Sequence, residues 1–154
     1  MRSVLQRVSE ARVIVHECTV GSIQKGLLVL LGVSRTDTRA DADYLVKKVL
    51  EVRIFADESG RMNRNVQEAG GAILVVSQFT LLADCRRGRR PSFDQAAPGE
   101  LAVDLYDYFV AGIRRSALRV ETGVFGASMQ VSLVNDGPVT LILDSADAAS
   151  NRAG

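Results

Sequence analysis

The stretch GLLVLLGV at residues 26–33 decides how this chain folds, because its apolar side chains occupy successive positions and not only alternate ones. A strand with one face in water alternates apolar and polar residues. An unbroken apolar run is typical of a central strand covered on both faces. A second run of this kind, AILVVSQF at residues 72–79, follows the glycine pair at 70–71. The two stretches predict neighbouring parts of a domain core, each buried on both sides.

Two further segments have helical spacing. After the helix-start residues Thr36, Asp37 and Thr38, apolar residues recur three or four positions apart, at Ala42, Leu45, Val46, Val49 and Leu50. Pro98 opens a second segment, whose apolar stripe is Leu101, Leu105, Tyr108, Phe109 and Ile113. The pattern predicts two long helices.

The remaining apolar segments are short and predict strands. They are Val4–Val8, Ala11–Glu17, Arg53–Phe55, Met129–Leu133 and Val139–Leu143. Residues 83–98 are polar and predict a loop, and the small, polar residues 145–154 predict a frayed tail. Together the segments predict a single mixed α/β domain with about seven strands and two long helices.

Length and composition narrow the class of protein. A chain of 154 residues has the size of one domain. Its longest apolar run, Leu27–Leu31, is far short of the ~18 residues that a membrane span needs, and polar residues interrupt any N-terminal signal core. We therefore expect a cytoplasmic protein that makes no membrane contact.

Cysteine and histidine are too scarce for several chemistries. Cys18 and Cys85 have no metal-ligand spacing, and His16 is the only histidine, which excludes a histidine-rich zinc site. There is no P-loop and no GxGxxG motif. We expect two reduced thiols and a histidine on a strand surface.

Ser77-Gln78-Phe79-Thr80, at the end of the second apolar run, is the first candidate for chemistry. Hydroxyls, an amide and main-chain N–H groups leaving the carboxyl end of a strand can bind a ligand or hold an oxyanion. The alternative is that these polar residues only mark the strand's exit into solvent.

Asn135-Asp136-Gly137-Pro138, between two expected strands, is the second candidate. All four residue types form turns, so an ordinary hairpin turn would explain them. A functional version would use Pro138, for example through a cis bond, to fix main-chain carbonyls in a pocket.

The run Arg86-Arg87-Gly88-Arg89-Arg90 is the third candidate. The whole chain has a net charge of only +1, which by itself argues against a nucleic-acid partner. Four of its positive charges nevertheless lie within these five residues, so the average conceals a concentrated charge. Arginine suits bidentate contact with phosphate, and the alternative is a solvated surface loop.

At these same residues the sequence resembles the D-aminoacyl-tRNA deacylase family. The resemblance runs from Met1 to about Asp144 and rests on motifs that occur in the family's order. They are VLQRV at 4–8, GLLVLLGV at 26–33, SQFTL at 77–81, RPSF at 90–93, YDYF at 106–109 and NDGPVT at 135–140, and in addition MNRNV at 62–66 resembles the family's MNxNV segment. Six of them in order make a specific signature.

The resemblance implies a fold, an activity and an assembly. It implies a compact three-layer β/β/α fold over residues 1–144, followed by a short polar tail, 145–154. The family hydrolyses the ester that joins a D-amino acid, and in many members glycine, to the 3′ end of tRNA. It acts as a homodimer without metal or cofactor, so we expect charged tRNA and a second copy of the chain as partners, and no DNA.

The resemblance also implies roles for individual residues. Ser77, Gln78, Phe79 and Thr80 match the family's catalytic segment. Gly137 and Pro138 match its Gly-cisPro segment, which reaches into the partner's site, and Arg7 matches an arginine that holds this segment, where Asn135 would also give support. We assign tRNA contact to Arg86, Arg87, Arg89 and Arg90.

Two mechanisms and two rival classes stay open. Catalysis assisted by the substrate's own ribose hydroxyl is favoured over nucleophilic attack by Thr80, because no base for Thr80 is evident. The rival classes are a deacylase of the same fold that removes an L-amino acid, for which a trans Gly137-Pro138 bond would speak, and a noncatalytic RNA-binding module.

Overall fold

The computed structural model describes residues 1–150, and residues 151–154 of the expected tail lie outside it. The strands are β1 (Arg2–Val15), β2 (Cys18–Ile23), β3 (Gly26–Gly32), β4 (Phe55–Ala56), β5 (Met62–Arg64), β6 (Ala72–Ser77), β7 (Val120–Thr122) and β8 (Gln130–Asp144). The helices are α1 (Arg39–Glu51), α2 (Gly99–Arg114) and the short α3 (Asp147–Ser150), with a 3₁₀ turn, η1 (Phe79–Leu82). The fold is the α/β class expected from the sequence.

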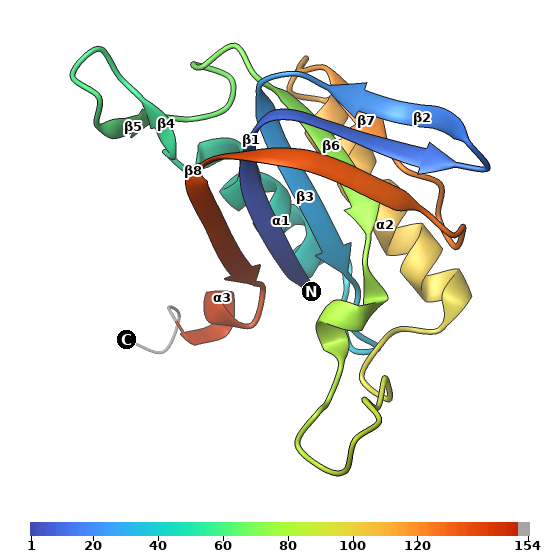
Figure 1. The fold of residues 1–154 in the computed structure, drawn as a ribbon. Coiled ribbons are helices and arrows are strands. Elements are labelled where there is room, and N and C mark those ends of the chain that lie inside the picture. Colours follow the sequence, from blue (N-terminus) through green and yellow to red (C-terminus); the bar gives the residue numbers. More distant parts are fainter. Residues whose placement is uncertain (151–154) are drawn as a thin grey trace.

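The two apolar stretches form the central strands β3 and β6, which pair in parallel (Figure 1). The strand order is β2-β1-β3-β6-β7, and β8 pairs with β1. Alternate side chains of β3 enter different cores: Leu27, Val29 and Leu31 join one cluster, and Leu28 joins the other. The prediction of strands covered on both faces is therefore confirmed.

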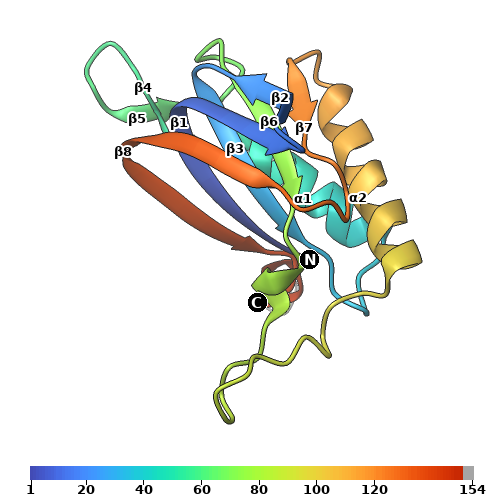
Figure 2. The same ribbon diagram turned by 45° about the vertical axis from the view of Figure 1, so that its right-hand side comes forward.

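The sheet folds over on itself and makes two of three layers (Figure 2). The first half of β1 pairs with β3, its second half pairs with β2, and β8 follows β1 along nearly its whole length. One core cluster lies between the helices and the sheet. The other contains residues from both halves of the folded sheet, namely Val8, Ala11, Val13, Ile23, Leu28, Leu74 and Val76. The layers are β/β/α, as the family resemblance implied.

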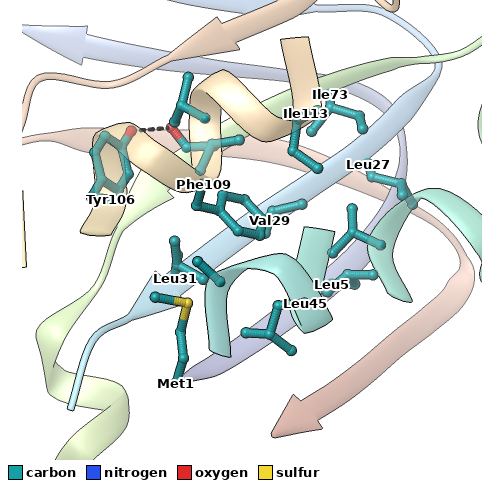
Figure 3. Packing of buried hydrophobic residues seen from close by; sticks show 14 of the residues in the cluster. Met1, Leu5, Leu27, Val29, Leu31, Leu45, Ile73, Tyr106, Phe109 and Ile113 are labelled. Atoms are coloured by element: carbon teal, nitrogen blue, oxygen red, sulfur yellow. Dashed lines mark hydrogen bonds between the residues drawn. The ribbon is translucent and has the colours of Figure 1, made fainter. Parts of the chain in front are cut away.

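The helices pack on the outer face of β3 and β6 with the apolar stripes that their spacing predicted. Leu45 of α1 and Phe109 of α2 are fully buried in one cluster with Val29 of β3, and Figure 3 shows Phe109 beside Val29. The carboxylate of Asp41 accepts hydrogen bonds from the main-chain N–H and the hydroxyl of Thr38, at 2.8 and 2.9 Å. This capping interaction explains why α1 begins directly after the predicted start residues.

Two pairs of expected strands are in fact single strands, which is a correction. Val4–Val8 and the first five residues of the expected strand Ala11–Glu17 belong to one strand, β1, which ends at Val15. The polar Ser9 and Glu10 between them are exposed where the ladder with β8 shifts register. The expected strands Met129–Leu133 and Val139–Leu143 likewise lie along β8, apart from Met129, which directly precedes it. The polar residues mark irregularities inside the ladder. The strands β2, β5 and β7 were not expected from the sequence.

The first residue of the expected tail is not frayed. Ser145 is buried, its main-chain N–H donates to the Met1 carbonyl at 2.8 Å, and its hydroxyl accepts from the Met1 ammonium at 2.7 Å. The same ammonium makes an ion pair at 2.5 Å with Asp37, whose side chain is only 6% exposed. Ordered structure therefore extends past residue 144.

Candidate active site

The SQFT segment lies where β6 ends, beside the end of β3. The N–H of Gln78 still donates to the Leu31 carbonyl of β3, at 2.8 Å, and the chain then tightens into η1 at Phe79. The Gln78 side-chain amide donates to the Thr80 hydroxyl. Within the described part of the chain, the N–H groups of Phe79 and Thr80 have no acceptor, since they begin the 3₁₀ turn. The segment thus presents two adjacent main-chain donors.

A pocket of about 300 Å³ opens beside this segment, at the carboxyl ends of β3 and β6. It is lined by Leu31, Val33, Val76, Ser77, Gln78, Phe79, Ala97, Ala102, Tyr106, Phe125, Gly126, Ala127, Met129 and Val131. Thr80 is not among its lining residues. The pocket is mainly apolar, and its polar groups gather at Ser77 and Gln78.

Tyr106 is the one side chain with a titratable proton among those lining residues, and its hydroxyl is already engaged. It donates to the Val75 carbonyl at 3.0 Å, the dashed line in Figure 3. Burial, with a smaller contribution from Asp107, raises the pKa of Tyr106 to about 12. The lining therefore offers no side chain that exchanges a proton near neutral pH.

Half of this pocket has no counterpart in the sequence analysis. Phe125 lies with its ring centroid 5.6 Å from that of Tyr106, and Met129 and Val131 complete the wall from the start of β8. The alternation at residues 129–133 indicates only a half-exposed strand. No local motif marks Phe125, because the pocket wall forms only when the segment after β7 crosses the end of the sheet.

Residues 136–139 form an excursion from the β1–β8 ladder. Asn135 pairs with Val8 and Thr140 pairs with Gln6, so four residues of β8 lie opposite the single residue Arg7. The interpretation of this segment as a hairpin turn is wrong, since β8 stays paired with β1 on both sides of it. The Gly137–Pro138 peptide bond is cis.

Two side chains hold the base of this excursion. The Asn135 side-chain oxygen accepts from the Val139 N–H at 2.7 Å, and its amide donates to the Thr140 hydroxyl at 3.0 Å. The Arg7 guanidinium donates to the Asp136 carbonyl at 2.8 Å and to the Ile54 carbonyl at 2.5 Å. Arg7 thus fixes the main chain immediately before Gly137 and Asn135 fixes it immediately after Pro138, while Gly137 and Pro138 themselves are exposed.

The two motifs lie far apart on one chain. Arg7 is in register with Leu27 and through it with Ile73, four residues before Ser77 on β6. From the excursion to the end of β6 the path crosses three strand spacings, from β8 through β1 and β3 to β6, and runs four residues along β6. The two displacements are perpendicular and combine to about 20 Å. A single chain therefore does not bring Gly137 and Pro138 to the pocket beside Phe79.

The arginine run lies in the long loop that projects beyond η1 in Figures 1 and 2. All four arginines are exposed. The loop returns to the site through Phe93, whose ring lies edge-on to that of Phe79 at 5.0 Å between centroids.

Other residues considered in the sequence analysis lie outside this region. Cys18 and Cys85 are free and exposed. His16 is exposed in the turn after β1, with a φ of 46°, and is not on the strand surface as expected. None of the helices in residues 1–150 is long and apolar enough to span a membrane.

Comparison with known proteins gives a consistent result. The sequence model of the family described as D-Tyr-tRNA(Tyr) deacylase matches residues 4–144. A D-aminoacyl-tRNA deacylase of Solibacter usitatus (strain Ellin6076) is 62% identical over 146 residues, which are 94% of this chain and 96% of that protein. One of Thermus aquaticus is 54% identical over 152 residues, covering 99% and 100%.

Two solved structures share the fold. One, described as the c-Myc DNA Unwinding Element Binding Protein, superimposes with a TM-score of 0.88 at 40% identity, covering 94% of this chain and 98% of the other. The second, of a probable eukaryotic D-amino acid tRNA deacylase, has a TM-score of 0.78 at 21% identity, covering 93% and 98%, and supports the fold alone. With the family match and these relatives, the chain belongs to the D-aminoacyl-tRNA deacylase family, hydrolases that act on aminoacyl-tRNA.

Proposed function

We propose that this enzyme removes D-amino acids and glycine from tRNA as a homodimer, with Gly137 and Pro138 of each subunit completing the pocket of the other. The separation of about 20 Å between these residues and the SQFT segment of the same chain carries this proposal. A symmetric pair of chains places the same two elements across an interface twice, so that each site is built from both subunits.

Rejection of L-amino acids by main-chain atoms follows from the need to accept many side chains. A side-chain pocket fits one amino acid, whereas rigid backbone excludes one configuration at Cα whatever the side chain is. The Asn135 and Arg7 contacts make the excursion rigid in this sense. Glycine has no side chain to exclude, so glycyl-tRNA is also a substrate in this scheme.

The apolar pocket suits the constant part of the substrate. All tRNAs end in the same adenosine, while the amino acid varies. A preformed pocket with fixed walls therefore suits binding of the adenosine better than binding of the amino acid. Its volume of about 300 Å³ and the aromatic rings of Tyr106 and Phe125 fit a flat, stacked base. The ester would then lie near the free N–H groups of Phe79 and Thr80.

Catalysis in this arrangement relies on main-chain donors and on the substrate. Water adds to the ester carbonyl carbon, and the Phe79 and Thr80 N–H groups stabilise the resulting oxyanion. The bond between the carbonyl carbon and the ribose 3′ oxygen then breaks. That oxygen takes a proton from the 2′-hydroxyl, which receives in turn the proton that the attacking water loses. The absence of a titrating side chain among the pocket residues between Leu31 and Val131 supports this route.

Replacing Thr80 by alanine tests this mechanism. The main-chain N–H remains and only the hydroxyl bonded to Gln78 is lost, so we expect kcat to fall less than about 10²-fold. Single-turnover hydrolysis of D-tyrosyl-tRNA measures the change. A loss of ~10³-fold or more with unchanged substrate binding would instead make Thr80 the nucleophile.

The activity itself is tested with purified protein and tRNA charged with D-tyrosine, L-tyrosine or glycine. We expect multiple-turnover release of D-tyrosine and glycine and no release of L-tyrosine. Release of L-tyrosine would favour a deacylase for mischarged L-amino acids, and binding without turnover would favour a noncatalytic RNA module. A duplex DNA competitor should not inhibit, because the site is proposed for a charged 3′ end of RNA.

The assignment of Arg86, Arg87, Arg89 and Arg90 to tRNA contact rests on their exposure and on their attachment to the site through Phe93. Outside this run the chain is net negative, so RNA should be held briefly and mainly near its charged end. Because aminoacyl-tRNA is formed and used where translation occurs, we place the enzyme in the cytoplasm.

A further inference from the structure

The loop that carries the arginine run is closed at its base. The main-chain N–H of Asp84 donates to the Ser92 carbonyl at 2.8 Å, and the Ser92 N–H donates back to the Asp84 carbonyl at 2.9 Å. The four arginines therefore lie on a short hairpin between these two residues, with Gly88 at a φ of 70° near its tip. A closed loop presents its charges in a restricted direction.

Arg86 differs from the other three arginines because its charge is compensated within the hairpin. Its guanidinium donates to both carboxylate oxygens of Asp84, at 2.9 and 2.6 Å, and its main-chain N–H donates to one of them at 3.0 Å. These bonds hold the pKa of Asp84 well below its usual range, so the pair stays ionised at physiological pH. Arg86 and Asp84 together contribute no net charge to the loop.

Arg87, Arg89 and Arg90 have no such partner. Within residues 1–150 no ion pair or hydrogen bond engages their guanidinium groups, and all three side chains are exposed. Three uncompensated positive charges thus occupy four successive positions. Guanidinium groups in this state are available for bidentate contact with phosphate oxygens.

The hairpin is also attached to an exposed aromatic surface beside the pocket. Phe93 follows the hairpin directly and packs edge-on against Phe79, whose side chain is 57% exposed. Basic side chains next to an exposed aromatic ring are the combination that binds single-stranded nucleic acid, through phosphate contacts and base stacking. Duplex RNA offers stacked bases that cannot reach such a ring.

We infer that Arg87, Arg89 and Arg90, together with Phe79 and Phe93, bind the unpaired nucleotides of the tRNA 3′ end, whereas Arg86 is a positioning residue that Asp84 holds in place. This inference rests on the proposed function, because the nucleotides bound by these residues belong to the tRNA 3′ end whose aminoacyl ester enters the pocket. It narrows the tRNA contact proposed above for all four arginines to Arg87, Arg89 and Arg90, and makes Arg86 a structural residue.

The test measures binding of a single-stranded RNA of about eight nucleotides that ends in CCA-3′ and has no amino acid attached. Binding is measured at several salt concentrations, and no catalysis takes place. Each phosphate contact to a single strand contributes about 0.7 to the slope of log K against log salt, so replacing Arg87, Arg89 and Arg90 by alanine should lower the slope by about 2. Replacing Arg86 alone should lower it by less than about 0.7. Phe93→Leu should weaken binding at every salt concentration with the slope unchanged.

Lys47→Ala, Lys48→Ala and Arg114→Ala combined form the matched control, because they remove the same charge from helix ends at the other end of the sheet. This control should leave the slope unchanged. Any of three outcomes would overturn the inference. The control could lower the slope as much as the triple variant does, or Arg86→Ala alone could lower it by one third of the triple effect or more. A blunt RNA duplex could also bind more strongly than the single strand. Deacylation of D-tyrosyl-tRNA by the unaltered protein is measured separately, so that failure of the proposed function is distinguished from failure of this binding site.

Discussion

Replacing Gly137 by alanine is expected to lower D-aminoacyl-tRNA hydrolysis by about 10³-fold or more, because the excursion that carries it could no longer keep its shape. Gly137 has a φ of 149°, which L side chains rarely adopt. A Cβ atom there would lie 2.8 Å from the main-chain nitrogen of Val139 and 3.2 Å from the Arg7 guanidinium. The main chain would have to shift at the point proposed to sort D from L.

Mixing two inactive variants makes this prediction specific to a site shared between subunits. Ala102→Trp fills the pocket but leaves the excursion intact, whereas Gly137→Ala does the opposite. In a mixed dimer one site receives both damaged parts and the other receives neither. Random exchange of equal amounts should therefore restore about a quarter of the activity of the unaltered protein.

The controls separate function from folding. Gly60→Ala introduces the same side chain at a φ of 77° in open space, so it should cost about 1 kcal/mol of stability and little activity. Val103→Trp introduces the same side chain on α2 at a position that does not line the pocket, and should leave activity unchanged. If the mixture stays inactive although subunits exchange, each chain works alone and the shared site is excluded.

Replacing Gly26 by alanine is expected to destabilise the protein by about 4 kcal/mol or more, the range of exceptional single substitutions. Gly26 begins β3 opposite Ala72 of β6, and a Cβ atom there would lie 1.9 Å from the Ala72 carbonyl oxygen and 2.7 Å from its nitrogen. These are backbone atoms of a buried strand, so no side-chain rotation relieves the overlap. Urea unfolding followed by circular dichroism measures the change in midpoint.

Gly99→Ala is the matched control for this substitution. Gly99 begins α2, no atom lies within 4 Å of the position that an alanine Cβ would occupy, and its φ is not in the left-handed region. The same change should therefore be neutral or slightly stabilising. Equal midpoints for Gly26→Ala and Gly99→Ala would mean that the two central strands can separate without loss of packing.

The central strands and long helices could be predicted because their signals are local. Unbroken apolar runs, helical spacing and start residues such as Thr38 and Pro98 lie within each segment. The polar interruptions at Glu10 and Asp136 predict strand ends that the structure does not have. At both places β1 and β8 stay paired on either side, and this pairing depends on the partner strand and not on the local sequence. Local patterns cannot distinguish a break from an irregularity inside a long strand.

The candidate site was only partly predictable for the same reason. The SQFT segment could be selected by its place at a strand end, but Phe125 and Met129 reach the pocket only through the tertiary path of the chain. The arginine run is evident as charge, while the Asp84 clamp on Arg86 needs the side-chain geometry of the hairpin. The sequence shows which residues are charged, and the structure shows which of these charges are paired with an opposite charge.

The two-sided burial of β3 and β6 also fixes a hierarchy of motions. Their amide hydrogens are shielded by a core on each face and bonded to neighbours on each edge, so they should exchange with solvent only when the whole domain unfolds. Asp136 and Gly137 are exposed outside the ladder, so their amide hydrogens should exchange without unfolding of the domain, while Pro138 has no amide hydrogen. A slowly exchanging interior thus carries a rapidly exchanging tip, and a variant of the excursion in which β3 and β6 still exchange slowly has kept its core even if its activity is lost.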